Sequence, residues 1–261
     1  MSTSPAPLSV IIITRNEERN IEACLQSVAW AAERIVVDAE STDRTCAIAA
    51  SCGASVVVRA WEGYAAAKST AVGHATHPWI LWLDADERVM EDLAQEITLL
   101  LAGEPAHAGY DVARRAYFLG RWIRHCGWYP GRVVRLFRRD RARFEAPRVH
   151  EHLVVDGSIG RLQGDLLHFT DETLYHYLKK LNRYTTLAAE DRRDRGATFR
   201  LADLLLRPPL TFLRMYLLRR GFLDGRHGLV LSLCSAGYVF MKYAKGWELS
   251  ASRQAGQDAR S

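Results

Sequence analysis

Residues 79–87 read WILWLDADE, an unbroken apolar run that ends at Asp84 and Asp86, two carboxylates separated by one residue. Such a run is typical of a strand that is buried on both faces of a parallel sheet. Ligands of α/β proteins bind at the carboxyl ends of these strands. Two carboxylates there can hold a hard divalent cation, while substrate phosphates supply further oxygen ligands. This segment alone leaves open a simpler alternative, in which a strand is followed by a helix with an acidic first turn.

A regular alternation of strand and helix patterns surrounds this segment, from residue 8 to residue 102. Strand patterns lie at 8–14, 34–38 and 55–59, and helix patterns at 21–28, 48–52, 64–75 and 90–101. Ser41, Thr42 and Asp43 can cap the second of these helices, and Gly53 can end it. Repeated units of this kind predict a mostly parallel sheet with helices on both faces.

Polar residues stand at the carboxyl ends of three of these strands. They are Thr14, Arg15, Asn16 and Glu17 after the first strand, Asp38 after the second, and Asp84 with Asp86. Because the carboxyl ends of parallel strands meet at one edge of a sheet, we expect these side chains to face one cleft. Asp38 could accept hydrogen bonds from a uracil ring or a ribose, or it could cap the next helix, and its position leaves both roles open.

The pattern changes after Gly103. Shorter strands at 110–117, 132–138 and 153–167 predict a mixed antiparallel extension of the sheet. From Asp171 the chain reads as helical again, and one apolar stripe consists of Leu174, Tyr177, Leu178, Leu181 and Tyr184.

Composition places the chain among ordinary globular proteins. Its 261 residues are 48% hydrophobic and 25% charged, with a net charge of +5 and a pI near 9.0. The five cysteines are odd in number and lack CxxC spacing, which indicates free thiols in a reducing compartment. Residues 1–7 have neither a basic start nor a long apolar core, so we expect no secretory signal and a cytoplasmic protein.

Two nucleotide-binding motifs are missing from the sequence. No GxGxxG follows the first strand, and no GxxxxGK[ST] occurs, which argues against a dinucleotide oxidoreductase and a P-loop ATPase. Nucleic acid is also not expected as a partner, because the basic segments lack the context of an RRM, a zinc finger or a helix-turn-helix.

Three ordered motifs resemble the signature of the family 2 glycosyltransferases. They are VIIITRNEE at 10–18, VVD at 36–38 with STD at 41–43, and LDADE at 83–87. In the second half, VHEH at 149–152 and RRGFLDGR at 219–226 are similar to the branch that includes lipopolysaccharide core β-1,4-glucosyltransferases. The resemblance implies a GT-A fold and an inverting, metal-dependent enzyme with a nucleotide-sugar donor, for which UDP-glucose is the expected case.

The resemblance also implies roles for individual residues. Thr14, Glu17 and Asp38 would line the nucleotide pocket, and Asp84 would lie toward the ribose or diphosphate. Asp86 would be the principal ligand of Mg²⁺ or Mn²⁺, which would neutralise charge on the departing nucleoside diphosphate.

Two positions near these residues depart from the family pattern. The pair Ala39-Glu40 stands where relatives commonly have a small residue and then Gly. Lys68 matches a family position whose cation could balance the diphosphate, but Ala67 and Ser69 replace the flanking amides there. The alternative for Lys68 is a solvated lysine on a helix surface.

Inverting transfer needs a base that takes the proton from the acceptor hydroxyl. Glu151, in the cluster His150-Glu151-His152, is the predicted base, and a structural salt bridge is its alternative role. The cluster is not a zinc motif, because it lacks HExxH spacing and successive strand residues point to opposite faces.

Basic and apolar segments suggest the acceptor and the location. A dense stretch with seven arginines between 132 and 148 suits an anionic glycolipid acceptor. A solvated charged face would give the same sequence pattern. Residues 204–222 combine leucines with arginines and could lie among the headgroups of the inner leaflet, or pack on the catalytic domain instead. The uncharged run 229–241 is too short to span a bilayer.

These patterns together give one expected organisation and one expected activity. We expect a disordered tail at 1–7, a GT-A catalytic domain at 8–170 with nucleotide-binding (8–102) and acceptor (103–170) halves, a helical membrane-associated extension at 171–249, and a disordered tail at 250–261. The expected reaction moves glucose onto a lipopolysaccharide inner-core heptose. The alternatives are a family 2 fold that binds sugar nucleotides without turnover, and a basic peripheral membrane or nucleic-acid binder.

Overall fold

The structure is a computed structural model that describes residues 6–145, 152–196 and 200–258, with side chains as far as residue 250. The chain divides into two compact units. Unit 1 contains residues 1–115 and 131–168, and unit 2 contains residues 116–130 and 169–261. Each unit is described by itself.

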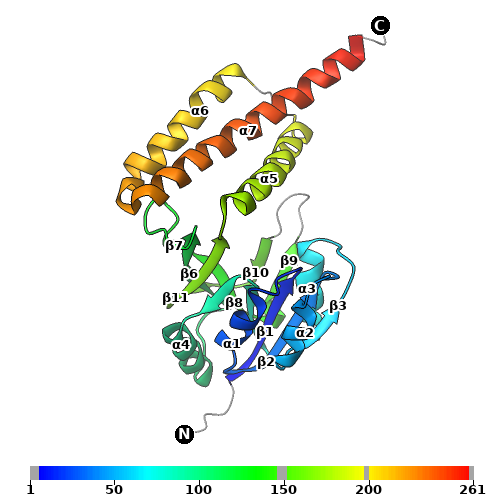
Figure 1. The fold of residues 1–261 in the computed structure, drawn as a ribbon. Helices are drawn as coiled ribbons and strands as arrows, with labels where there is room; N and C mark the ends of the chain where they lie inside the picture. The colour runs from blue at the N-terminus through cyan, green and yellow to red at the C-terminus, as the bar shows by residue number, and fades with distance from the viewer. Residues whose placement is uncertain (1–5, 146–151, 197–199, 259–261) are drawn as a thin grey trace. The chain divides into compact units, whose positions relative to one another are not determined.

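A mixed sheet forms the centre of unit 1 (Figure 1). Its parallel part has the order β3-β2-β1-β4, from β1 (Ala6–Thr14), β2 (Ala31–Asp38), β3 (Ser55–Val58) and β4 (Trp79–Asp84). The sheet continues in the order β8-β6-β11-β5, from β5 (Glu87–Val89), β6 (Gly109–Phe118), β8 (Val133–Arg138) and β11 (Ile159–Asp171), with antiparallel pairing of β8 to β4 and β6 and of β5 to β11. A separate ribbon pairs β9 (Ala142–Glu145) with β10 (His152–Val155). The predicted parallel core and its antiparallel extension are both confirmed.

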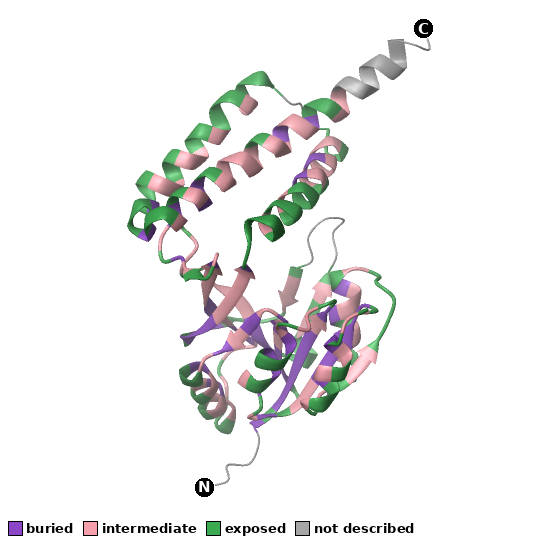
Figure 2. Cartoon of the chain, in the orientation of Figure 1, coloured by how far each residue is buried: buried purple, intermediate pink, exposed green. Residues whose placement is uncertain are grey.

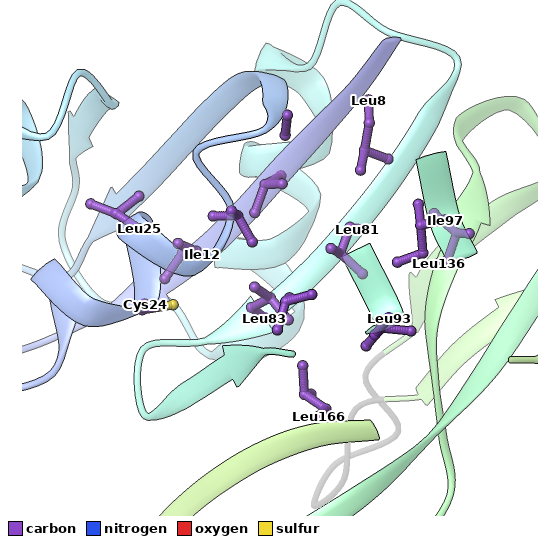
Figure 3. Packing of buried hydrophobic residues seen from close by; sticks show 14 of the residues in the cluster. Leu8, Ile12, Cys24, Leu25, Leu81, Leu83, Leu93, Ile97, Leu136 and Leu166 are labelled. Atoms are coloured by element: carbon purple, nitrogen blue, oxygen red, sulfur yellow. The ribbon is translucent and has the colours of Figure 1, made fainter. Parts of the chain in front are cut away.

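The apolar run of β4 is buried because the sheet is covered on both faces. Leu81 and Leu83 belong to one core cluster, with α1 (Ile21–Ser27), α2 (Thr45–Ser51) and α4 (Glu91–Ala102) contributing residues from the helices. Ile80 belongs to the second cluster, to which α3 (Tyr64–His74) contributes. Successive residues of a strand point to opposite faces, so a strand with two covered faces must be apolar throughout. Figure 3 shows the first cluster, where Leu81 and Leu83 lie near Leu93 and Leu136.

The cap of α2 differs from the prediction in detail. The residue at the N-cap is Arg44, and its side chain makes no capping bond. Asp43 instead accepts hydrogen bonds from the backbone nitrogen (3.0 Å) and the hydroxyl (2.5 Å) of Thr45. The Asp43 carboxylate, one residue before the N-cap, therefore accepts the hydrogen bond of a backbone N–H in the first turn of α2. Gly53 follows the helix with a φ of +76°, as the prediction of a glycine stop requires.

Unit 2 is mainly helical and has its own small core. Its elements are β7 (Arg121–Trp122), which pairs with the end of β6, then α5 (Leu174–Asp194), α6 (Leu201–Leu213), a π-helical turn (Arg214–Leu218), a 3-10 turn (Gly221–Asp224) and α7 (Gly225–Asp258). Phe118, Ile123, Cys126 and Leu231 form the buried cluster. In Figure 2, α5 and α6 are largely exposed, whereas β1 and β4 of unit 1 are largely buried.

Regular secondary structure extends into both segments that were expected to be disordered tails. β1 already begins at Ala6, whose backbone nitrogen donates to Trp30 O at 3.1 Å. At the other end α7 continues to Asp258, well beyond residue 249. Residues 250–258 contain Ala, Arg and Gln, which are good helix formers and extend a helix that has already been nucleated.

Candidate functional site

The strand register brings the predicted residues to one edge of the sheet. In the parallel ladders Thr14 is the partner of Asp38, and Ile13 is the partner of Asp84. The carboxyl ends of β1, β2 and β4 are therefore level with one another. The convergence expected from the sequence is present in the backbone itself.

Two loops at this edge are tied together by short polar bonds. The backbone nitrogen of Asn16 donates to Ser41 Oγ at 2.7 Å, and that of Thr42 donates to Asn16 Oδ1 at 2.8 Å. Asp38 is fully buried and accepts from both the backbone nitrogen (2.7 Å) and the hydroxyl (2.5 Å) of Ser41. Asp38 therefore holds the loop before α2, and the N-cap of that helix is a different residue.

Glu17 and Thr14 lie in the same region but differ in their bonding. Glu17 accepts from Asn20 Nδ2 at 2.9 Å, and its backbone nitrogen donates to Thr45 Oγ1 at 2.8 Å. The hydroxyl of Thr14 is buried and has no hydrogen-bond partner within the described residues. A buried hydroxyl without a partner is uncommon, and a polar ligand group at this edge would satisfy it.

Beside this edge lies a small pocket between the ends of β2 and β3 and the start of α3. It is lined by Val37, Asp38, Ala39, Arg59, Ala60, Trp61, Glu62, Ala66, Ala67 and Thr70. The Trp61 ring meets the Tyr64 ring edge to face, with centroids 4.6 Å apart. The pocket thus combines an aromatic wall with the buried carboxylate of Asp38. Glu40, which differs from the family pattern, has a φ of +55° and does not line this pocket.

A buried arginine organises the acidic motif after β4. Arg135, on β8, is 1% exposed, and its Nη2 donates to Asp84 Oδ2 at 2.7 Å and to Glu87 Oε1 at 2.5 Å. Glu87 is fully buried, and its other oxygen accepts from the backbone nitrogen of Asp84 at 3.0 Å. A buried carboxylate needs such compensation, so Arg135 and Glu87 together set the shape of the turn at residues 84–87.

Two cations flank the indole of Trp82. The Arg135 guanidinium lies 3.5 Å from the ring centre and the Lys68 ammonium 3.9 Å from it. Lys68 is only 3% exposed, so the alternative of a solvated surface lysine is wrong. An aromatic face can hold cations in a desolvated site. The result is a positive environment beside Asp84.

Burial and neighbouring charges shift the pKa values of the Asp84 and Glu87 carboxyls in opposite directions. Desolvation favours a raised pKa for Asp84, but the Arg135 and Lys68 cations outweigh it and lower that pKa. Burial raises the pKa of Glu87, and the like charge of Asp84 adds to this increase. The Arg135 cation acts in the opposite direction but does not cancel it. Asp84 is thus held as a carboxylate, while Glu87 depends on Arg135 for its charge.

Asp86 meets a histidine that the sequence did not reveal. His168 Nε2 lies 3.5 Å from Asp86 Oδ2, because β5 pairs with the end of β11 and places His168 opposite Glu87. Adjacent ligands of one small cation lie about 3 Å apart, so this pair suits two ligands of one metal ion. Within the described ranges, no group of three or more Cys, His, Asp or Glu side chains lies close enough together to hold a metal ion by itself. Substrate oxygens and water would have to complete the coordination.

The other expected residues either lie outside the described ranges or are already bonded to other groups. Glu151, the predicted base, and Arg148 lie outside the described residues. The described arginines of the basic stretch are already bonded: Arg132 to Asp111, Arg135 to Asp84 and Glu87, Arg138 to Asp140, Arg139 to Ala75 O, Arg141 to Asp156, and Arg143 to Glu145. Their pairing favours a structural role over recognition of an anionic acceptor.

Comparison with known proteins matches this architecture. The sequence profile described as "Glycosyl transferase family 2" matches residues 9–156, which include most of β1, the whole of β4 and the acidic motif. The chain belongs to glycosyl transferase family 2. A similar protein is the lipopolysaccharide core biosynthesis glycosyltransferase LpsC of Rhizobium meliloti, which is 34% identical over 94% of this chain and 93% of its own length. An uncharacterized glycosyltransferase of Rickettsia typhi is 31% identical over 93% and 87%.

Solved structures place this family 2 glycosyltransferase in the GT-A fold. The mannosyltransferase PcManGT from Pyrobaculum calidifontis, solved with GDP-mannose and Mn²⁺, aligns with a TM-score of 0.53 at 16% identity and covers 94% of this chain and 90% of its own. At this identity the likeness concerns the fold alone. The expected family and fold are both confirmed.

Proposed function

We propose that this enzyme transfers a hexose from a UDP-linked donor, with inversion, to a hydroxyl of a lipid-linked glycan, and that it uses Mg²⁺ or Mn²⁺. The observation that carries the proposal is the pair Asp86 and His168, 3.5 Å apart at the carboxyl edge of the sheet. Carboxylate oxygen and imidazole nitrogen are both suitable ligands for Mn²⁺. The bound Mn²⁺ of the mannosyltransferase PcManGT supports the same assignment.

In this proposal, different residues of the sheet edge bind different parts of the donor. The pocket beside Asp38 and Trp61 is the proposed site of the base, with Thr14 and Glu17 near the ribose. Lys68 and Arg135 lie beside Asp84 and can balance the charge of a diphosphate. The divalent cation would act as a Lewis acid that neutralises the departing nucleoside diphosphate. Glu151 stays the proposed base for the acceptor hydroxyl.

The proposed acceptor is the inner core of lipopolysaccharide, with glucose transferred to a heptose. The support is the likeness to LpsC, whose name assigns it to lipopolysaccharide core biosynthesis, over nearly the full length of both chains. We place the enzyme at the inner face of the cytoplasmic membrane. Among the helices at 6–145, 152–196 and 200–258, none has the length and apolar content that crossing a bilayer needs. Contact through exposed leucines of α6 is the proposed means of attachment.

The test of this function measures UDP binding by thermal shift and calorimetry, with and without Mn²⁺. Mn²⁺ should strengthen UDP binding in the wild-type protein. Asp86→Asn and His168→Ala should each weaken the Mn²⁺-dependent part by about 10–100-fold, while UDP binding without metal stays close to that of the wild type. Asp140→Asn, an exposed carboxylate on the 3-10 turn Arg139–Arg141, is the control. Equal Mn²⁺ dependence in all four proteins would contradict the metal site.

A second test separates an enzyme from a protein that binds sugar nucleotides without turnover. Glu151→Gln should abolish glucosyl transfer to a heptose-containing acceptor and leave UDP affinity nearly unchanged, because the base acts on the acceptor. Full turnover in this variant would remove Glu151 from the mechanism. Absence of turnover in the wild type with every nucleotide sugar would favour the binding protein.

A further inference from the structure

The segment RRGFLDGR, residues 219–226, has no place in the donor site described above. In unit 2 it forms the 3-10 turn and the start of α7, and it is bonded to the loop 123–130 that follows β7. The backbone nitrogen of Cys126 donates to Arg219 O at 3.1 Å. A Cβ on Gly228 would lie 1.9 Å from Gly221 O, so the backbones here approach too closely for any side chain. The segment therefore has a compact and specific local structure.

Asp224 fixes the position of the neighbouring loop. It is 3% exposed, and its carboxylate accepts from the backbone nitrogens of Arg124 (3.2 Å) and His125 (2.9 Å) and lies 3.0 Å from His125 Nδ1. Both carboxylate oxygens are occupied by these bonds. Asp224 thus holds the loop and leaves the guanidinium groups of the nearby arginines to other partners.

A pocket opens between the loop and the 3-10 turn. It is lined by Arg121, Trp122, Arg124, His125, Leu223 and Asp224. The Arg124 guanidinium lies 4.4 Å from the centre of the Trp122 ring. Among the residues that the structure describes, no carboxylate forms an ion pair with Arg121 or Arg124, in contrast to most arginines of the stretch 132–143. Two exposed arginines in one pocket are thus available to an anion.

Large apolar side chains stand beside this cationic pocket. Leu223, which lines it, is 53% exposed, and its neighbour Phe222 is 46% exposed. Leu218, just before the two arginines of the segment, is 80% exposed. A soluble anion would use the arginines alone, whereas a lipid would use both the cations and the apolar side chains.

We propose that this pocket binds the phosphate group of an anionic membrane lipid. Arg121 and Arg124 donate to the phosphate oxygens, which suits the forked geometry of guanidinium, and Leu223 with Phe222 contacts the apolar part of the lipid. A phosphomonoester offers more charge and more acceptor oxygens to two arginines than a carboxylate headgroup does. The inference rests on the membrane contact proposed above, but it names a different site in unit 2.

The experiment measures partition of the full chain onto phosphatidylcholine vesicles that contain either phosphatidic acid or phosphatidylserine, at matched zeta potential. The wild-type protein should prefer phosphatidic acid by about tenfold. In the double variant Arg121→Gln/Arg124→Gln this preference should fall to about one. The double variant Arg121→Lys/Arg124→Lys keeps the charge and should retain only part of the preference, because lysine cannot bind in a bidentate manner.

The matched control is Lys179→Gln/Arg183→Gln, which removes two exposed charges from α5 and should keep the tenfold preference. A folded wild-type protein without preference, or a glutamine variant that retains it, would overturn the proposal. Inorganic phosphate that raises the melting temperature of the wild type while both vesicle types bind equally would assign the pocket to a soluble anion instead. The Mn²⁺ and UDP measurements on Asp86→Asn test the proposed activity separately, since Arg121 and Arg124 have no part in them.

Discussion

Arg135 is the residue on which the electrostatics of the candidate site depend. It is the shared partner of Asp84 and Glu87, and its Nε and Nη1 are buried without a hydrogen-bond partner within the described residues. Nothing in the sequence distinguished Arg135 from the other arginines of its stretch, because its burial follows from the pairing of β8 with β4.

Arg135→Gln should destabilise the protein by about 3–5 kcal/mol near pH 8, because Glu87 would stay buried with only the more distant Arg114 cation, whose Nη1 lies 3.9 Å from Glu87 Oε1. The folded pKa of Glu87 is already raised by burial and would rise further. When the pKa of a carboxyl is higher in the folded than in the unfolded state, the folded protein loses stability as the pH rises. The destabilisation caused by Arg135→Gln should therefore be smaller at pH 5 than at pH 8, by about 1–2 kcal/mol. Urea denaturation at both pH values measures this. Arg138→Gln, on an exposed arginine paired with Asp140, is the control, and an equal penalty at both pH values would contradict the account.

The reactivity of the Cys46 thiol depends on Asp38, which lines the candidate nucleotide pocket. Burial, with a hydrogen bond to Asp38, raises the pKa of the Cys46 thiol from 9.0 to about 11. At pH 8 its thiolate fraction is therefore about a hundredfold below that of a free thiol, and alkylation by iodoacetamide should be slower by a similar factor. Asp38→Asn should speed the reaction, and Asp140→Asn should not. Peptide mass spectrometry measures the rates, and a rate for Cys46 equal to that of a reference peptide would contradict the geometry.

At the scale of elements, the three-residue strand β5 has the largest effect on the site. Its antiparallel pairing with β11 places His168 opposite Glu87 and so next to Asp86. The two partners are far apart in the sequence, and His168 belongs to no recognisable motif. A shift of one residue in this register would turn His168 to the other face of the sheet.

The helix α6 carries the proposed membrane contact. Leu205, Leu206 and Leu210 are each 59–60% exposed, and among its described residues α6 has none that is buried. Replacement of all three by Gln should lower partition onto anionic vesicles at low salt by at least about tenfold, because the apolar area that enters the interface is lost. Leu99→Gln, on α4 of unit 1 and 75% exposed, is the control. Unchanged cosedimentation of the triple variant would contradict a role for α6.

At the scale of the whole molecule, the two units have separate hydrophobic cores. Leu231 on α7 is fully buried with Phe118 and Ile123 of unit 2. Leu231→Ala should lower the free energy of unfolding by about 2–5 kcal/mol, because a cavity remains in the core. UDP affinity should stay within about twofold, because the residues of the proposed donor site all lie in unit 1. Leu233→Ala, on an exposed residue of the same helix, is the control for denaturation and calorimetry. A large loss of UDP affinity in Leu231→Ala would show that the units are energetically linked.

The sequence by itself determined the order of strands and helices in the α/β half, the family, and the edge where Asp38, Asp84 and Asp86 gather. These features depend on local periodicity and on the rule that parallel strands end together. Only the tertiary structure decided that Arg135 and Lys68 are buried against Trp82, that His168 meets Asp86, and that Arg121 and Arg124 share a pocket. These contacts depend on long-range antiparallel pairing and loop packing, which leave no periodic signal in the sequence and follow only from how the chain buries its apolar faces.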